Sequence, residues 1–119
     1  MRVFITGVGV VSSIGLGKDA FFESLAAGRS GISPVTRFDV SKLGRTNAGE
    51  VKQFRAQDHL TAAETRRMGR CSQMAFAGAR MAIKDARLDE TALHGPRACV
   101  VLGTTMGEAN LLGRLENAW

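Results

Sequence analysis

The sequence predicts a layered α/β fold with a buried central helix, and two observations lead to this prediction. Residues 3–6 and 98–102 are short apolar runs without alternation, which is typical of strands covered on both faces. Between them, residues 62–85 form a long helical pattern with apolar side chains on nearly every side. Such a helix has no face suited to water, so we expect it to lie between layers of other elements.

The first strand and the first helix are predicted from the opening residues. Met1–Gly7 is rich in β-branched and apolar residues and predicts a buried strand. After a stretch of glycine and serine, Phe21 and Leu25 are spaced at i, i+4, which predicts a short amphipathic helix over Lys18–Ala27. Gly28 then supplies a left-handed residue that ends this helix.

An irregular region is expected over residues 29–60. It contains Pro34 and several glycines and serines, which favour loops and a small hairpin. Ala48–Val51 is the segment within this region that can form a short strand.

A capping box formed by Thr61 and Glu64 predicts the start of the central helix. We expect this helix to run without interruption from Ala62 to Asp85. Several small residues keep it thin enough for neighbouring elements to approach closely. They are Ala75, Ala77, Gly78, Ala79 and Ala82.

Residues 97–102 predict a second buried strand, followed by a turn at Gly103–Gly107 and a helix over Glu108–Trp119. Two buried strands and a helix that is apolar all round cannot cover all of their own faces. We therefore expect residues 1–119 to be part of a larger domain that is incomplete at its C-terminal end. Such a fragment exposes apolar surface, so it should be poorly stable as a monomer.

The composition narrows the class of protein. The 119 residues are 45% hydrophobic and 23% charged, which fits a globular protein and excludes a disordered chain. The apolar runs are far shorter than the roughly 18 residues of a membrane span, and glycines and serines interrupt any signal-peptide core, so we expect a cytoplasmic protein. The net charge of +5 suits an acidic partner. The few aromatic residues are scattered and do not indicate a nucleic-acid-binding stripe.

Two cysteines and two histidines are the candidates for nucleophilic or metal chemistry. Cys71 and Cys99 have apolar neighbours and no metal-ligand spacing, so we expect buried, reduced thiols with neither a metal nor a disulfide. His59 and His94 show no arrangement that pairs either of them with a cysteine, and we expect both at the surface. No catalytic residue and no cofactor is therefore assigned to this chain.

Two glycine motifs resemble nucleotide-binding loops without completing them. The run Gly7–Ser12 follows a predicted strand, as a dinucleotide fingerprint does, but its third glycine is missing and the next helix starts too late. Gly17 and Lys18 are arranged as in a P-loop, but Asp19 stands where a hydroxyl residue is needed and would repel phosphate. Neither motif predicts a nucleotide site.

Five segments, in this order and spacing, resemble the β-ketoacyl synthase family, and in particular its KAS II-like members. They are VFITGVGVVSSIG, LAAGRSGI, AGEVKQF, RRMGRCSQMA and VVLGTTMG, and they span nearly the whole chain. The resemblance implies the thiolase-like fold, in which two βαβ-rich halves stack in layers, with this chain as the N-terminal part of the first half. It also implies a homodimer. A glycine usually stands in this family where the chain has Arg87, and an arginine in a left-handed position costs about 1 kcal/mol.

The resemblance also implies a reaction. Family members transfer an acyl group to a cysteine thiolate, and two histidines assist the decarboxylation of malonyl-carrier protein and the Claisen condensation that follows. In the family pattern these three residues lie beyond Trp119, so the chain alone is expected to be inactive. The implied activity is that of a 3-oxoacyl-[acyl-carrier-protein] synthase, an acyltransferase of fatty-acid or polyketide biosynthesis. A non-catalytic chain-length-factor-like member, acting as a dimer partner, is the alternative that the sequence leaves open.

The resemblance assigns carrier docking to two arginines. Arg66 and Arg67 match basic positions that hold the acidic acyl carrier protein, whose phosphopantetheine bears the acyl chain. Guanidinium groups suit this role because they grip carboxylates and phosphates with paired hydrogen bonds. Ala63 replaces a further basic position of the family, and Glu64 is close enough in sequence to neutralise part of the charge.

The resemblance also assigns one residue to substrate binding. Met106 matches a position that lines the acyl-chain pocket, where a flexible methionine can yield to an alkyl chain. Thr104 and Thr105 replace smaller residues of the family, so the width of the pocket is expected to differ.

Overall fold

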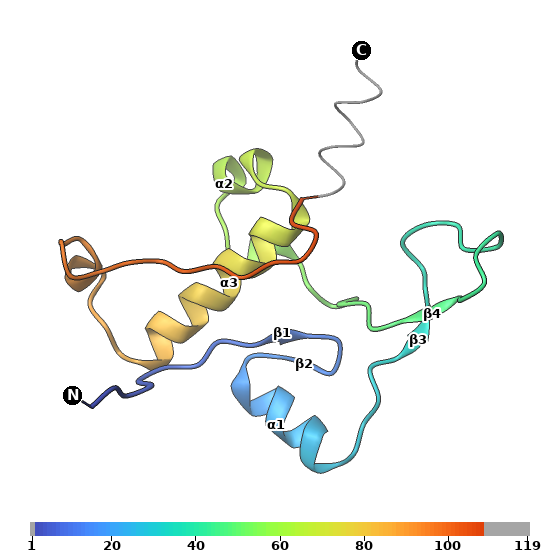
Figure 1. Cartoon of the computed structure of the whole chain (residues 1–119), viewed down its shortest axis with the longest axis horizontal. Coiled ribbons are helices and arrows are strands. Elements are labelled where there is room, and N and C mark those ends of the chain that lie inside the picture. Colours follow the sequence, from blue (N-terminus) through green and yellow to red (C-terminus); the bar gives the residue numbers. More distant parts are fainter. Residues whose placement is uncertain (1, 109–119) are drawn as a thin grey trace. The chain divides into compact units, whose positions relative to one another are not determined.

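The computed structural model describes residues 2–108 of the chain, which fall into two units. We call the first, which combines residues 2–9 with residues 55–108, the helical unit, and the second, Val10–Phe54, the hairpin unit. The four strands and helix α1, labelled in Figure 1, fall within the residues of the hairpin unit, and helices α2 and α3 fall within those of the helical unit. The chain therefore mixes helices and strands, as predicted.

A tight hairpin precedes the first helix of the hairpin unit. Strand β1 (Val11–Ser12) pairs antiparallel with strand β2 (Gly15–Leu16). The Ser12 hydroxyl donates to the carbonyl of Gly15 (2.9 Å) and accepts from the N–H groups of Ile14 (3.3 Å) and Gly15 (3.1 Å). Serine hydroxyls stabilise turns by bonding to nearby backbone groups in this way. The glycine and serine stretch thus forms a hairpin that the sequence pattern does not predict.

Helix α1 (Lys18–Ala26) confirms the predicted short helix to within one residue. Gly17 and Gly28 flank it with φ angles of 82° and 65°, in a region that costs other residues about 1–2 kcal/mol. The predicted left-handed stop at Gly28 is therefore confirmed. Phe22 and Leu25 are more than half exposed, so the apolar face of this helix is only partly covered.

A second hairpin lies in the region predicted to be irregular. Strand β3 (Ser33–Pro34) pairs antiparallel with strand β4 (Asn47–Ala48), and Ser33 lies opposite Ala48. The predicted small hairpin is confirmed. Its second strand begins one residue before the predicted segment Ala48–Val51 and ends at the first residue of that segment.

The long predicted helix is divided in two. Helices α2 (Ala62–Arg67) and α3 (Arg70–Asp85) are separated by Met68 and Gly69, whose backbones are extended. The prediction of one uninterrupted helix is wrong at this point, although its start and its end are correct. Glycine inside a helix costs about 1 kcal/mol relative to alanine, and Gly69 instead serves as the N-cap of α3.

The core of the helical unit lies where the short 3₁₀ helix η1 (Ala56–Asp58) contacts α2 and α3. Its buried apolar residues are Ala56, Leu60 and Ala77. Because Ala77 is the one buried residue of α3 and most of the others are half-buried, the expectation of a fully buried central helix is not confirmed.

A left-handed arginine follows helix α3. Arg87, two residues beyond the end of α3, has a φ angle of 52°, so the turn keeps the left-handed conformation although it is unfavourable for an arginine. A second 3₁₀ helix, η2 (Glu90–Leu93), comes after it.

The two predicted buried strands are not present among the described residues. Residues 3–6 and 98–102 have no strand partner, and Val3, Ile5 and Val100 are 83%, 88% and 95% exposed. The prediction is wrong for this structure because a strand exists only through hydrogen bonds to a neighbouring strand, and no described segment supplies them.

The N-terminal segment instead lies against α3. A Cβ atom on Gly9 would overlap the carbonyl oxygen of Gly78, and one on Gly7 would overlap that of Ala82. The small residues of α3 therefore permit a close approach, as predicted. The two glycines of the incomplete dinucleotide motif serve this packing.

Candidate functional site

The two arginines assigned to carrier docking end helix α2. Arg66 and Arg67 occupy its last turn and are exposed. Within residues 2–108, neither guanidinium takes part in an ion pair. Cations in the last turn of a helix also interact favourably with the helix dipole. The two guanidinium groups can therefore each donate paired N–H hydrogen bonds to an anionic partner.

Glu64, in the first turn of the same helix, is engaged elsewhere. Its carboxylate accepts from the Thr61 N–H (2.7 Å), the Thr61 hydroxyl (2.9 Å) and the Arg80 guanidinium (3.2 Å). The Thr61 hydroxyl accepts in turn from the Glu64 N–H (3.3 Å), which confirms the predicted capping box. The hydrogen bonds from the Thr61 backbone and hydroxyl hold the pKa of Glu64 below its usual value, and the charge of Arg80 adds to them. The carboxylate is thus ionised at neutral pH and committed to partners other than the docking arginines.

Arg80 of α3 joins three elements of the helical unit. Its guanidinium donates to the carbonyl of His59, directly after η1 (2.6 Å), and to Glu64 of α2 (3.2 Å). It also lies 4.6 Å from the centre of the Phe76 ring on α3, within the range of a cation–π interaction. The sequence pattern does not single out Arg80, because its hydrogen-bond partners lie 21 and 16 residues away in the chain.

Gln73 of α3 holds the other end of α2. Its side-chain N–H₂ group donates to the carbonyls of Thr65 (3.0 Å) and Met68 (2.9 Å). Backbone carbonyls at the end of a helix lack helical partners and need such donors. Helix α2 is therefore attached to α3 near both ends, by Arg80 through Glu64 and by Gln73 directly.

Met106, the residue assigned to the acyl pocket, lies in an exposed turn. The Gly107 N–H donates to the Thr104 hydroxyl (3.0 Å), and Gly107 has a φ angle of 54° that favours glycine. The Met106 side chain is 74% exposed. Two cavities found among the described residues do not include it, so the pocket assignment stays a prediction.

Glu108 ties this turn to the start of α3. Its carboxylate accepts from the Ser72 N–H (2.5 Å), and hydrogen bonds from the Ser72 hydroxyl, the Ser72 N–H and the Cys71 N–H lower the pKa of Glu108. Because α3 has no side-chain cap at Gly69, Glu108 supplies an anion to the unpaired donors of the helix N-terminus. The remainder of the helix predicted over Glu108–Trp119 lies outside the described residues.

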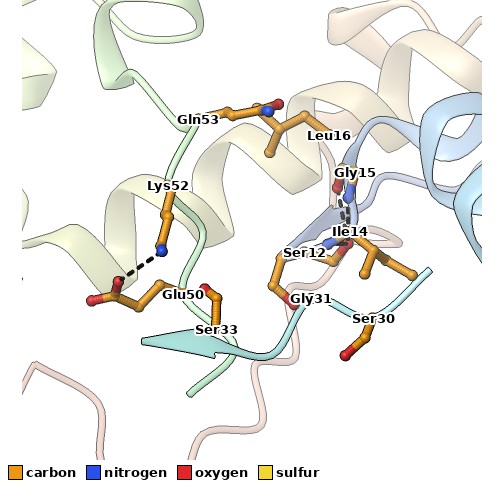
Figure 2. Close-up of a pocket in the computed structure, with 11 residues that line it drawn as sticks. Ser12, Ile14, Gly15, Leu16, Ser30, Gly31, Ser33, Glu50, Lys52 and Gln53 are labelled. Carbon is orange, nitrogen blue, oxygen red and sulfur yellow. Dashed lines mark hydrogen bonds and ion pairs between the residues drawn. The ribbon is translucent and has the colours of Figure 1, made fainter. Parts of the chain in front are cut away.

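A polar cavity of about 220 Å³ lies within the hairpin unit (Figure 2). Lys52, on its rim, donates to the Pro34 carbonyl (3.2 Å) and lies 4.0 Å from the Glu50 carboxylate. No cysteine or histidine lines this cavity, so it does not contain the cysteine nucleophile and the two histidines that the family resemblance implies. Four serines line it: Ser12, Ser13, Ser30 and Ser33.

The cysteines and histidines have different environments. Cys71 is half-buried on α3, whereas Cys99 is exposed, so the prediction of a buried thiol is wrong for Cys99, which belongs to an unpaired segment. His94 is exposed, as predicted, and His59 is half-buried. The described part of the chain contains no group of three His, Cys, Asp or Glu side chains placed to hold a metal ion. It also contains no helix long and apolar enough to cross a membrane.

Known proteins resemble the chain over nearly its whole length. The family described as "Beta-ketoacyl synthase, N-terminal domain" matches residues 1–118. A 3-oxoacyl-[acyl-carrier-protein] synthase 2 of Synechocystis sp. is 37% identical over 111 residues, which are 93% of this chain and 27% of that protein. The Streptomyces coelicolor protein named "Actinorhodin polyketide putative beta-ketoacyl synthase 2" is 40% identical over 107 residues, which are 90% of this chain and 26% of that protein.

A solved structure gives the corresponding likeness in three dimensions. "The ishigamide ketosynthase/chain length factor" is similar with a TM-score of 0.82 and 41% sequence identity, over 95% of this chain and 28% of that one. The chain thus spans about a quarter of the length of the curated relatives that it matches.

Proposed function

Since the chain belongs to the β-ketoacyl synthase family, we propose that residues 1–119 are the N-terminal portion of a 3-oxoacyl-[acyl-carrier-protein] synthase. The family match over residues 1–118 carries this proposal, and 37% identity to a synthase 2 over 93% of the chain supports it. The whole protein would be a cytoplasmic, homodimeric acyltransferase without a cofactor. It would extend an acyl thioester with malonyl-carrier protein in fatty-acid or polyketide biosynthesis.

The proposed reaction divides into acyl transfer and condensation. A cysteine thiolate first takes the acyl group from the carrier thioester, which forms a new thioester and releases the carrier thiol. Malonyl-carrier protein then loses carbon dioxide, and the resulting carbanion attacks the acyl carbon, so that a carbon–carbon bond forms and the cysteine thiolate leaves. Two histidines and backbone amides stabilise the negative charge that develops on the thioester oxygens.

We assign the nucleophile and the two histidines to a part of the protein outside residues 1–119. The 119-residue chain alone is then inactive in condensation. Under this proposal none of the cysteines and histidines of the chain has a catalytic role; they are Cys71, Cys99, His59 and His94.

Within this chain we assign carrier docking to Arg66 and Arg67. Their exposure at the end of α2 supports the assignment, as does the commitment of the Glu64 carboxylate to other partners. An acidic carrier protein and the phosphate of its phosphopantetheine both accept paired hydrogen bonds from guanidinium groups. Replacing both arginines by alanine should weaken carrier binding and reduce its dependence on salt.

We assign Met106 to the lining of the acyl pocket. Its side chain is 74% exposed and is not closely packed against the described residues. Glu108 holds the turn that carries it against α3. Under this assignment Met106→Phe should shorten the longest acyl chain that the whole protein extends, because the larger side chain fills pocket volume. Mass spectrometry of the products measures this limit, and an unchanged limit would contradict the assignment.

The proposed activity is tested with the full-length protein expressed from its natural reading frame. The protein is incubated with acyl-carrier and malonyl-carrier thioesters, and the products are identified by mass spectrometry. We expect a 3-oxoacyl-carrier product and release of carbon dioxide. Failure to form either the product or an acyl-enzyme would contradict the proposal.

A chain-length-factor role is the second candidate, because the similar solved structure is named as a ketosynthase/chain length factor. A member of this kind would bind a partner synthase and would not itself form an acyl-enzyme. Activity that requires an added partner synthase, with no acyl group on this protein, would select this role.

A further inference from the structure

The attachment of helix α2 decides where the docking arginines extend. The helix has six residues, and a helix this short is not stable without tertiary contacts. The extended backbones of Met68 and Gly69 separate it from α3, so helical hydrogen bonding does not continue between the two. The direction of Arg66 and Arg67 is therefore set by the side chains that hold α2 in place.

Arg80 makes the attachment at the start of α2. Its two hydrogen bonds reach acceptors on different elements, the His59 carbonyl (2.6 Å) and the Glu64 carboxylate (3.2 Å). A planar guanidinium fixes two such acceptors relative to each other, and the Phe76 ring supports it at 4.6 Å. The Arg80 and Glu64 side chains are 44% and 27% exposed, so solvent screens the pair and its effect on global stability should be small. Its main effect is on orientation.

Glu64 transmits this constraint into the helix. The carboxylate that Arg80 holds also closes the capping box on the Thr61 N–H (2.7 Å), so moving it would open the first turn of α2. Gln73 holds the opposite end through the Thr65 carbonyl (3.0 Å). A single turn and a half of helix, held at both ends in this way, cannot rotate freely.

We infer that Arg80 is a positioning residue for carrier docking: by fixing Glu64 and the His59 carbonyl to α3, it orients Arg66 and Arg67 toward an acidic partner. The inference rests on the proposed docking role of those two arginines. Side chains that are ordered before binding lose less freedom when the partner arrives, so releasing α2 should weaken binding by a factor of about five.

The test measures the Kd of an acyl carrier protein for the full-length protein. Arg80→Met keeps an unbranched side chain over Phe76 and removes both hydrogen bonds, and we expect it to raise the Kd about fivefold. Arg80→Lys should restore part of the affinity, because an ammonium group can still bond to one acceptor. Arg97→Met removes an exposed positive charge elsewhere in the helical unit, and as the matched control it should change the Kd less than about twofold.

The decisive comparison is made in a protein that carries Arg66→Ala and Arg67→Ala. If Arg80 acts through these arginines, Arg80→Met should have no further effect on the Kd in that background. The same increase in both backgrounds would overturn the inference, and so would an unchanged Kd for Arg80→Met in the native background. If the double alanine variant binds the carrier as tightly as the native protein does, the proposed docking site itself is wrong.

Glu64→Gln is a second variant, which serves if Arg80→Met does not fold. It keeps an acceptor for Thr61 and weakens the bond to Arg80, so the Kd should rise in the same direction. Amide hydrogen exchange should become faster in residues 61–67 and stay unchanged in α3. Faster exchange throughout both helices would indicate a general loss of stability and would contradict a positioning role.

Discussion

Replacing Gly9 by alanine should destabilise the protein, because backbone atoms of α3 occupy the space that a Cβ atom needs. The added atom would overlap the carbonyl oxygen of Gly78 and would lie 2.8 Å from the backbone nitrogen of Ala82. Neither atom can rotate away as a side chain could, since both belong to the middle of a helix. Overpacking of this kind costs about 1–3 kcal/mol. The unfolding midpoint in urea falls by this loss divided by the m-value of the full-length protein, and the m-value grows with the surface that unfolding exposes.

The assay is urea unfolding of the full-length protein followed by circular dichroism. Gly95→Ala is the matched control in the same unit, because a Cβ atom there meets nothing within 4 Å and Gly95 is not among the residues with positive φ. At such a position alanine restricts the unfolded chain and stabilises the protein by about 0.4–1 kcal/mol. Equal midpoints for Gly9→Ala and Gly95→Ala would refute the close packing of the N-terminal segment on α3.

Three further substitutions test local features of the structure. Glu108→Gln should lower stability at neutral pH by about 0.5 kcal/mol, the effect of a half-buried anion at a helix N-terminus. Hydrogen bonds from Ser72 hold the pKa of Glu108 below its usual 4.5. The difference in stability between the native protein and Glu108→Gln should therefore persist above pH 4.5 and vanish as the pH falls through the lowered pKa. A difference in unfolding midpoint that does not change with pH would contradict this. Arg87→Gly should raise the free energy of unfolding by about 1 kcal/mol by removing the left-handed arginine, and an unchanged Tm would argue against strain there. Thr61→Ala should lower stability by about 1 kcal/mol in thermal unfolding, whereas Thr61→Ser, which keeps the capping hydroxyl, should not.

Local sequence signals predict the parts of the fold that depend on neighbouring residues. The capping box at Thr61, the left-handed stop at Gly28 and the helix end at Asp85 are all confirmed. Each depends on hydrogen bonds or φ preferences that act within a few residues. Such interactions form wherever the right residues occur together, so a short stretch of sequence is enough to predict them.

The strands and the helix break depend on contacts that are distant in sequence. An apolar run such as residues 100–102 shows that its side chains favour burial, but it does not say which segment pairs with it. The break before α3 coincides with a contact from far along the chain, since a Cβ atom on Gly69 would overlap the Glu108 carboxylate. No window of sequence around Gly69 contains that information.

The candidate site divides in the same way. Resemblance to a family is what assigns roles to Arg66, Arg67 and Met106, because their residue types alone indicate only an exposed helix face and an apolar turn. The sequence pattern does not indicate Arg80 and Glu108, since their hydrogen-bond partners lie 16 and 36 residues away in the chain. From the sequence alone, a charged residue with no oppositely charged neighbour is predicted to be solvated at the surface. Only the fold shows that a partner distant in sequence lies close to it.

The proposed function is tested most directly by identifying the residue that receives the acyl group. The full-length protein is incubated with an acyl-carrier thioester in the absence of malonyl-carrier protein, digested, and analysed by mass spectrometry for a thioester-linked acyl group. The account predicts acylation of a single cysteine outside residues 1–119, with Cys71 and Cys99 unmodified and the rate reduced by Arg66→Ala with Arg67→Ala. An acyl group on Cys71 or Cys99, or on no cysteine at all, would contradict it.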